Sequence, residues 1–168
     1  MRRWGKKKER IMFKSINEID KFRYDDCVIN KMIIDELGIT LSVNALIVRA
    51  DNSQNANYTE SYADTTKIEL PGGSIDKVVR DGCRVYDAND VLLKEIPDEV
   101  VDINSEKWDK YFEGQYLIGI RNADGEIVLE IEIYDAEGYG ISDSFSVYIK
   151  CDDICMQWEK YLNRVSMY

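Results

Sequence analysis

Cys151 and Cys155 are the residues whose spacing most resembles a metal site, because two aspartates lie between them. Thiolates with neighbouring carboxylates can hold zinc. Structural zinc usually takes four ligands in two close pairs, whereas the other cysteines, Cys27 and Cys83, are isolated. Four cysteines in a chain of this length do not make a dense disulfide framework. We therefore expect ordinary thiols, with no metal and no cofactor.

Histidine is absent from the 168 residues. This excludes Ser-His-Asp and Cys-His catalysis, H-E-x-x-H zinc chemistry and imidazole proton transfer. Carboxylates remain as acid–base groups, but with 32 acidic residues, pairs arise by chance, and Asp87 with Asp90 is first a turn signature. We expect no catalytic residues. A carboxylate-based hydrolase or glycan-active enzyme is the alternative, and it requires a concave pocket that holds two carboxylates in unlike environments.

The segment from Asp51 to Tyr62 is polar, and Asp51, Ser53 and Asn55 alternate as in an EF-hand calcium loop. The sixth position is Ala56 instead of glycine, and the twelfth is tyrosine instead of glutamate, so we reject an EF-hand. A different calcium site could use Asp51, Glu60 or Asp64. Long polar loops often carry binding function, although a loop that only meets water has the same composition. The binding candidates here are Asp51, Asn55, Tyr58, Glu60 and Tyr62.

The formal net charge of −10, with a pI near 4.6, disfavours nucleic acid as a partner. An acidic surface attracts a protein partner with a basic surface, although the same charge also keeps a protein in solution without any partner. No apolar run approaches the roughly 18 residues of a membrane span, and no apolar segment follows the basic start as in a secretory signal. We expect a cytoplasmic protein without membrane contact.

Two β-hairpins are predicted to form the framework. Between Cys27 and Ala50, two alternating runs meet at Gly38, where glycine permits a positive φ. One predicted face of the first run consists of Cys27, Ile29, Lys31 and Ile33, and the other consists of Val28, Asn30, Met32 and Ile34. The predicted apolar face of the second run consists of Ile39, Leu41, Val43, Ala45 and Ile47. The second hairpin turns at Asp124-Gly125. Its second strand directs Ile127, Leu129, Ile131 and Ile133 inward, and the outward acids Glu126, Glu130 and Glu132 form a further binding candidate.

Two short helices complete the predicted fold. Ser15-Ile16-Asn17-Glu18 fits a capping box, and the segment from Asn104 to Gly114 has a cap, an acidic first turn and a glycine stop. Trp108, Tyr111 and Phe112 share one helix face, which favours core packing over an exposed aromatic stripe for a partner. A third hairpin is predicted around Asp87–Asp90. We predict a mainly β (β-rich α+β) fold: an antiparallel sandwich or curved sheet of seven to nine strands with two short helices.

The first eleven residues differ from the rest, with six basic residues and one acidic residue. Codons for Lys7 to Met12 can include a purine-rich ribosome-binding sequence followed by ATG. We expect residues 1–11 to be a translated leader, with a disordered basic arm as the alternative, and residues 12–168 to form a single β-rich domain.

The stretch from Phe22 to Ile29, followed by a hairpin, resembles the opening of small bacterial proteins that begin with an F-x-H-D-x-x-I strand. Some of these are immunity proteins of polymorphic toxin systems. The resemblance covers residues 22–50. Tyr24 stands at the histidine position, so a role that depends on imidazole does not carry over. Such families imply binding without catalysis, in which the protein covers the active site of a partner.

The sequence therefore favours a non-enzymatic acidic binding protein, and in particular an immunity protein that blocks a basic toxin. Besides the carboxylate enzyme, a structural or carbohydrate-binding β-module is an alternative. Its aromatic platform would have to come from Trp4, Trp108 or Trp158.

Overall fold

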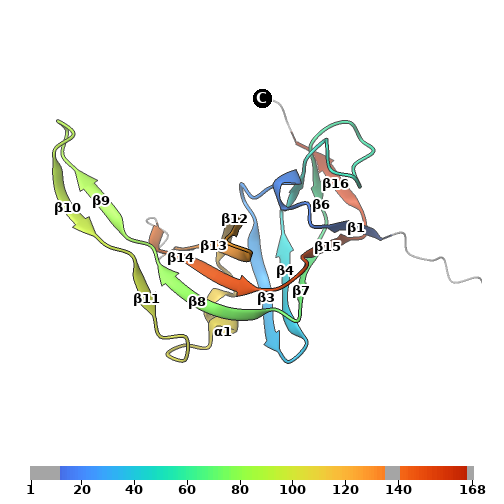
Figure 1. Ribbon diagram of the computed structural model, residues 1–168. Helices are drawn as coiled ribbons and strands as arrows, with labels where there is room; N and C mark the ends of the chain where they lie inside the picture. The colour runs from blue at the N-terminus through green and yellow to red at the C-terminus, as the bar shows by residue number, and fades with distance from the viewer. Residues whose placement is uncertain (1–11, 135–140, 166–168) are drawn as a thin grey trace, which may run out of the picture.

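The computed structural model describes residues 12–134 and 141–165 (Figure 1). The expected leader, residues 1–11, lies outside the described residues. The fold is mainly β and its strand pairs are antiparallel, as predicted. The described residues form sixteen strands, so the prediction of seven to nine was too low. Several strands have only two to four residues, which is too short for an alternating pattern to reveal them.

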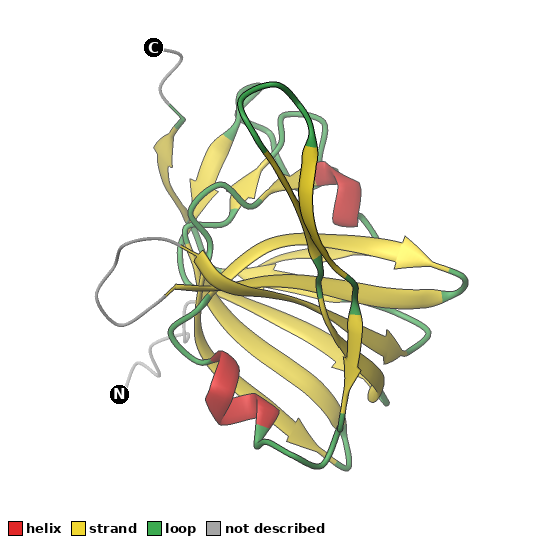
Figure 2. Cartoon of the chain, turned by 90° about the vertical axis from the view of Figure 1, so that its left-hand side faces the viewer, coloured by secondary structure: helices red, strands yellow, loops and turns green. Residues whose placement is uncertain are grey.

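One ten-stranded sheet makes up most of the molecule (Figure 2). Its strands, in spatial order, are β1 (Phe13–Ile16), β15 (Cys155–Trp158), β7 (Thr66–Pro71), β4 (Gly38–Asn44), β3 (Val28–Asp35), β12 (Tyr116–Ala123), β13 (Glu126–Tyr134), β14 (Ile141–Lys150), β8 (Ser74–Arg80) and β11 (Glu99–Val101). A four-stranded sheet has the order β16 (Tyr161–Arg164), β6 (Ser61–Ala63), β5 (Ile47–Val48) and β2 (Phe22–Arg23). Both sheets contribute to one continuous core.

The β3–β4 hairpin is confirmed, but both predicted faces of its first strand are wrong beyond Ile29. A β-bulge between Ile29 and Lys31 inserts a residue into β3, so Ile29 and Met32 are both buried while Lys31 is exposed. The second arm ends at Asn44, because Ala45 adopts a positive φ of 63° and the chain then enters the four-stranded sheet. The predicted continuation of the alternation beyond Asn44 therefore does not occur.

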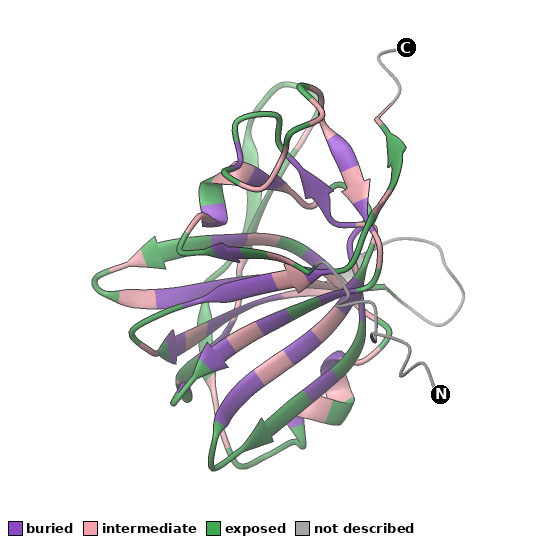
Figure 3. Ribbon diagram, turned by 90° about the vertical axis from the view of Figure 1, so that its right-hand side faces the viewer, coloured by how far each residue is buried: buried purple, intermediate pink, exposed green. Residues whose placement is uncertain are grey.

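The β12–β13 hairpin forms as the sequence predicts. Asp124 and Gly125 both have positive φ, as a tight primed turn requires. The isoleucines of β13 and Leu129 are buried, whereas the three glutamates lie on the opposite face and are only half-buried. Buried and more exposed positions alternate along strands of the large sheet (Figure 3). Val128 is also fully buried, although it lies on the outward face.

The five-residue helix α1 (Trp108–Phe112) places its aromatic side chains in the core, as predicted. Phe112 is fully buried, and its ring centroid lies 5.4 Å from that of Trp108 and 5.8 Å from that of Phe145 in β14. The backbone after α1 bonds to β3, where Gly114 N–H donates to the Ile29 carbonyl. The helix thus links β3 to β14, which are not neighbours in the sheet.

The prediction of two short helices was wrong in two respects. The capping-box segment forms strand β1 and a single 3₁₀ turn, η1 (Ile19–Lys21), because Ser15 lies in the edge strand and pairs with Met156. The Ser15 hydroxyl does donate to the Glu18 carboxylate, at 2.8 Å, but outside a helix. Helix α1 also begins later than expected, since Asn104 and Ser105 form a turn on Asp102. No helix of the described residues has the length and apolar character to cross a membrane.

Candidate functional site

A two-stranded ribbon, formed by β9 (Cys83–Tyr86) and β10 (Leu92–Ile96), projects from the body (Figure 1). We call residues 83–96 the β9–β10 arm. Its strands continue β8 and β11, so the arm is an outward extension of the last pair of the large sheet. The predicted hairpin around Asp87–Asp90 forms its tip. The Asp87 carboxylate accepts from Asn89 N–H and Val91 N–H, and Asp90 has a positive φ.

The base of the arm is held by backbone contacts and carboxylates. Gly82 N–H donates to Asp98 at 2.7 Å, and a Cβ on Gly82 would lie 2.0 Å from the Ile96 carbonyl oxygen, so only glycine fits there. The Asp81 carboxyl accepts from the Ser146 hydroxyl at 2.9 Å. Its burial raises the pKa of Asp81, and the nearby charges of Asp98 and Glu130 raise it further. These contacts fix the point at which the arm leaves the sheet.

The surface of the arm is apolar to an unusual degree for a segment in solvent. None of its residues is buried, and Leu93 is 64% exposed. Its exposed apolar side chains are Val85, Tyr86, Val91, Leu92, Leu93 and Ile96. Tyr86 and Leu92 are cross-strand partners, and Arg84 pairs with Glu95 at 3.1 Å on the same ribbon. Six exposed large apolar side chains on one short ribbon exceed the scattered single apolar residues of an ordinary surface, and such exposure marks a contact site for another molecule.

The polar loop is built around its own side chains. The Asn55 side-chain amide donates to the carbonyls of Val48, Arg49 and Thr59, at 3.2, 3.1 and 2.9 Å. The other predicted binding residues are placed as follows: Asp51 pairs with Lys21, Glu60 with Arg23, Tyr62 lies half-buried in β6, and Tyr58 is 93% exposed. The loop brings the predicted residues to one region, but only Tyr58 and Asp51 present most of their side chains to solvent, and the Asp51 carboxylate is paired with Lys21.

Replacing Asn55 with alanine is expected to lower the free energy of unfolding by about 2–3 kcal/mol, because the carbonyls of Val48, Arg49 and Thr59 lose their donor. Urea denaturation followed by circular dichroism measures the loss. Tyr58→Ala is the matched control in the same loop and should change stability by less than about 0.5 kcal/mol. If Asn55→Ala were as stable as the control, Asn55 would not have the structural role assigned here.

The outward acids of β13 are not a uniform anionic face. Glu130 accepts from Arg121 at 2.8 Å, and Arg121 also donates to the Tyr148 hydroxyl. Glu132 accepts from the Tyr134 hydroxyl at 3.4 Å. The Glu130 carboxylate is therefore neutralised by a cross-strand partner, which the pattern of a single strand does not show, whereas Glu132 accepts from a tyrosine of its own strand.

Glu126 forms a carboxyl pair with Asp76, next to Lys150. Burial and the hydrogen bond with Asp76 raise the pKa of Glu126, whereas the hydrogen bonds from Glu126 and Lys150 lower the pKa of Asp76. Carboxyls whose pKa values are shifted in opposite directions are one feature that a carboxylate enzyme needs. However, neither carboxyl lines the nearby depression, which is formed by neighbours such as Ser74, Gly125 and Lys150. The concave site required by the enzyme alternative is therefore not formed around this pair.

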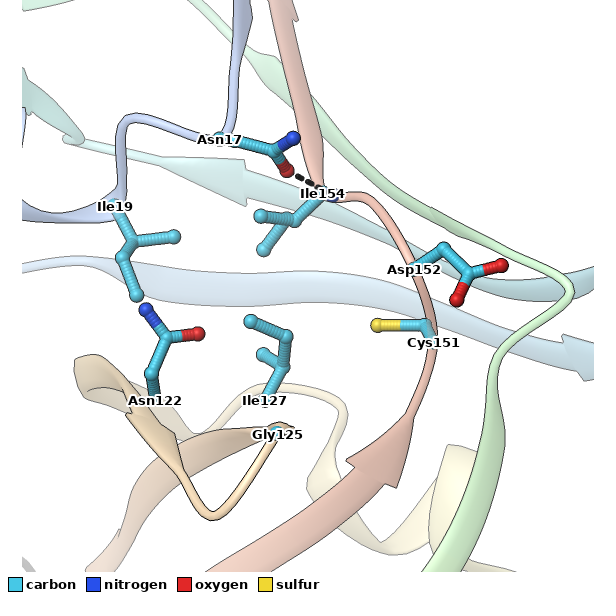
Figure 4. A pocket seen from close by; sticks show the side chains of 8 residues that line it. All are labelled: Asn17, Ile19, Asn122, Gly125, Ile127, Cys151, Asp152 and Ile154. Carbon is cyan, nitrogen blue, oxygen red and sulfur yellow. Dashed lines mark hydrogen bonds between the residues drawn. The ribbon is translucent and has the colours of Figure 1, made fainter.

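A cavity of about 230 Å³ opens at the end of β12, β13 and β14 (Figure 4). Its apolar wall consists of Ile19, Ile127 and Ile154, and the Cys151 thiol reaches into it. Burial raises the pKa of Cys151, and the adjacent aspartates add to this effect. The cavity is smaller than the roughly 300–1,000 Å³ of most ligand pockets.

The described part of the chain contains neither a group of side chains placed to hold a metal ion nor an exposed tryptophan platform for a carbohydrate. The four cysteines are free thiols, and no three or more cysteine, aspartate or glutamate side chains of the described residues are grouped to hold a metal ion. Trp108 and Trp158 are buried, so they form no exposed aromatic platform. Trp4 lies outside the described residues.

Sequence reasoning located the hairpin of the arm but assigned it no function. One signal was available: Val91-Leu92-Leu93 is a continuous apolar run beside a turn, where a half-buried strand would alternate. Comparisons of this chain with protein-family models, curated proteins and solved structures find no match.

Proposed function

We propose that this chain is a non-enzymatic, acidic, cytoplasmic binding protein that engages a protein partner with a basic surface through the β9–β10 arm. The observation that carries the proposal is the arm itself, an ordered ribbon without a single buried residue that exposes six large apolar side chains. Protein interfaces typically have such an apolar centre with aromatic residues and a polar rim.

The charge of the arm supports a basic partner. From Asp81 to Asp98 the sequence has five acidic and two basic residues, so the arm and its base carry a net negative charge. The net charge of −10 adds a long-range attraction that would accelerate association with a cationic surface. The outward carboxylates of β13 and the exposed Tyr58 are secondary contact candidates in this proposal.

More specifically, we propose that the partner is a basic toxin and that the projecting arm covers or enters the active site of this toxin. The resemblance of residues 22–50 to immunity proteins of polymorphic toxin systems supports this proposal. A projecting ribbon suits this role, because it can reach into a concave site that a flat sheet could not enter.

Removing the arm is the direct test of the proposed function. Residues 83–96 can be replaced by Asn-Gly, because the two sides of the ribbon meet at Gly82 and Pro97. The partner is captured with the wild-type chain from the source organism, identified by mass spectrometry and purified for affinity measurement. We expect a basic partner in 1:1 complex, and an affinity at least about a hundredfold lower for the armless variant.

Point substitutions separate loss of the contact from loss of the fold. Tyr86→Ser with Leu92→Ser removes apolar contacts from one face of the arm, whereas Leu37→Ser removes an exposed leucine from the body. The first variant should lose affinity, and the control should retain it. Equal affinity of the wild-type, armless and serine variants would show that the arm is not the contact, and the absence of any basic protein partner would overturn the proposal.

A further inference from the structure

The cavity at the end of β12, β13 and β14 is lined by three segments that are far apart in the chain (Figure 4). Asn17 and Ile19 belong to the segment that leads from β1 into η1, residues 122–127 surround the turn of the β12–β13 hairpin, and residues 151–154 connect β14 to β15. In the strand order of the large sheet, β1 and β15 lie in one half, and β12, β13 and β14 lie in the other. A molecule in the cavity would therefore touch both halves. None of the described lining residues belongs to the β9–β10 arm, so this site is independent of the proposed function.

Hydrogen bonds of Asn17 fix one wall of the cavity. The Asn17 N–H donates to the Ile154 carbonyl at 2.9 Å, and the side-chain carbonyl of Asn17 accepts from the Ile154 N–H, also at 2.9 Å. The side-chain amide nitrogen of Asn17 donates to the Asp153 carboxylate at the same distance of 2.9 Å. These bonds hold the segment before η1 against the β14–β15 connection without a ligand. A preformed site loses less conformational entropy on binding than one that must be ordered by its ligand.

The interior of the cavity offers an apolar surface and an unused amide. Ile19, Ile127 and Ile154 line it, and Figure 4 shows the Asn122 side chain reaching toward the same space. The Asn122 amide has no hydrogen-bond partner among the described residues. An asparagine side chain has two N–H donors and one carbonyl acceptor in one plane. A primary amide matches it in both directions, because one amide can donate to Asn122 while its carbonyl accepts from Asn122.

The charges around the cavity disfavour an anionic ligand. Asp152 lines the cavity, and Asp153 follows it in the chain. Burial raises the pKa of Cys151, and both aspartates raise it further, so their negative potential extends to the thiol inside the cavity. The adjacent Lys150 is paired with Asp76 at 3.3 Å. A carboxylate would therefore be repelled at this site, whereas an uncharged molecule would not.

The volume of the cavity limits the ligand to a small molecule. The cavity measures about 230 Å³, and an apolar cavity of about 150 Å³ is large enough to bind benzene. We infer that this cavity binds a small neutral primary amide with a branched or aromatic apolar group. The amide pairs with Asn122, and the apolar group contacts Ile19, Ile127 and Ile154. A ligand of this size makes few contacts, so we expect a dissociation constant on the order of a millimolar.

Titration of the full chain with two matched probes, followed by NMR of the backbone amides, tests the inference. Isovaleramide and isovalerate share a carbon skeleton, but isovalerate is an anion at neutral pH. We expect saturable binding of isovaleramide and at least about fivefold weaker binding of isovalerate. Asn122→Leu should weaken the binding of isovaleramide by about five- to tenfold, because the partner of the ligand amide is lost. Asn104→Leu, at an exposed asparagine outside the cavity, is the matched control and should leave the affinity unchanged.

Protection of Cys151 locates the bound molecule in the wild-type chain. Methyl methanethiosulfonate is a small neutral reagent that modifies thiols, and mass spectrometry of peptides measures its rate at each cysteine separately. With isovaleramide at about ten times its dissociation constant, Cys151 should react at least about fivefold more slowly. Cys83 is exposed and lies outside the cavity, so it is the internal control and should react at an unchanged rate.

Four results would each overturn the inference. They are the lack of saturable binding of isovaleramide up to about 50 mM, equal affinity for isovalerate, equal affinity of Asn122→Leu and the wild-type chain, and an unchanged reaction rate at Cys151. None of them bears on the binding of a protein by the β9–β10 arm, because the arm contributes no residue to the cavity.

Discussion

Replacing Gly38 with alanine is expected to lower the free energy of unfolding by more than about 3 kcal/mol. Gly38 ends the β3–β4 turn with a φ of 127°, where a side chain is strained. A Cβ at this position would lie 2.4 Å from the Leu70 carbonyl oxygen and 2.7 Å from the Gly72 amide nitrogen. Both atoms belong to backbone, so β7 would have to move away from β4, its neighbour in the middle of the sheet.

Gly125→Ala is the matched control for this prediction. Gly125 also has a positive φ, 82°, but an added Cβ would meet no atom within 4 Å. Replacing Gly125 with alanine should lower the free energy of unfolding by only about 1–2 kcal/mol, which is the cost of a positive φ for a residue with a side chain. Chemical denaturation of both variants measures the difference, and equal destabilisation would mean that the close approach of Gly38 to Leu70 has no energetic importance.

Replacing Phe112 with alanine is expected to destabilise the protein by about 3–5 kcal/mol. The ring is fully buried between Trp108 and Phe145, so its loss removes aromatic contacts to both and leaves a cavity where α1 meets the sheet. Denaturation curves give the magnitude, and near-ultraviolet circular dichroism should show a changed tryptophan environment. Tyr111→Phe, which removes only a hydroxyl from a less buried neighbour, should cost far less. A loss below about 1 kcal/mol for Phe112→Ala would contradict the role of this ring as a link between the two parts of the fold.

The alternation of β13 predicts its buried face because each residue from Ile127 to Ile133 occupies a regular strand. The same reasoning fails in β3, where the bulge after Ile29 changes the side of every later residue. A bulge depends on the pairing of two strands, and the local sequence does not specify it. The Ser15–Glu18 segment is a second case in which the local pattern is not decisive. Its sequence fits a common helix-capping pattern, but it forms a strand because β1 pairs with β15, which is far away in the chain.

The candidate site shows which features require tertiary information. The outward direction of Glu130 follows from alternation, but its ion pair with Arg121 follows only from the register between two strands. Asn55 is typical of a polar binding loop, yet its amide joins the end of β5 to the loop by donating to the carbonyls of Val48 and Thr59. The tip of the arm is predictable from its turn residues. Its exposure is not, because exposure depends on the lack of any neighbouring element packed against it.

The position of the arm has an evolutionary consequence. No side chain between Cys83 and Ile96 contributes to the core, so substitutions there should change the folding free energy by little. Selection for recognition and selection for folding then act on separate residues. Substitutions within this one hairpin could therefore change the binding specificity while the rest of the fold stays constant. Recombination of the arm between related chains with similar folds could likewise change which partner each chain binds.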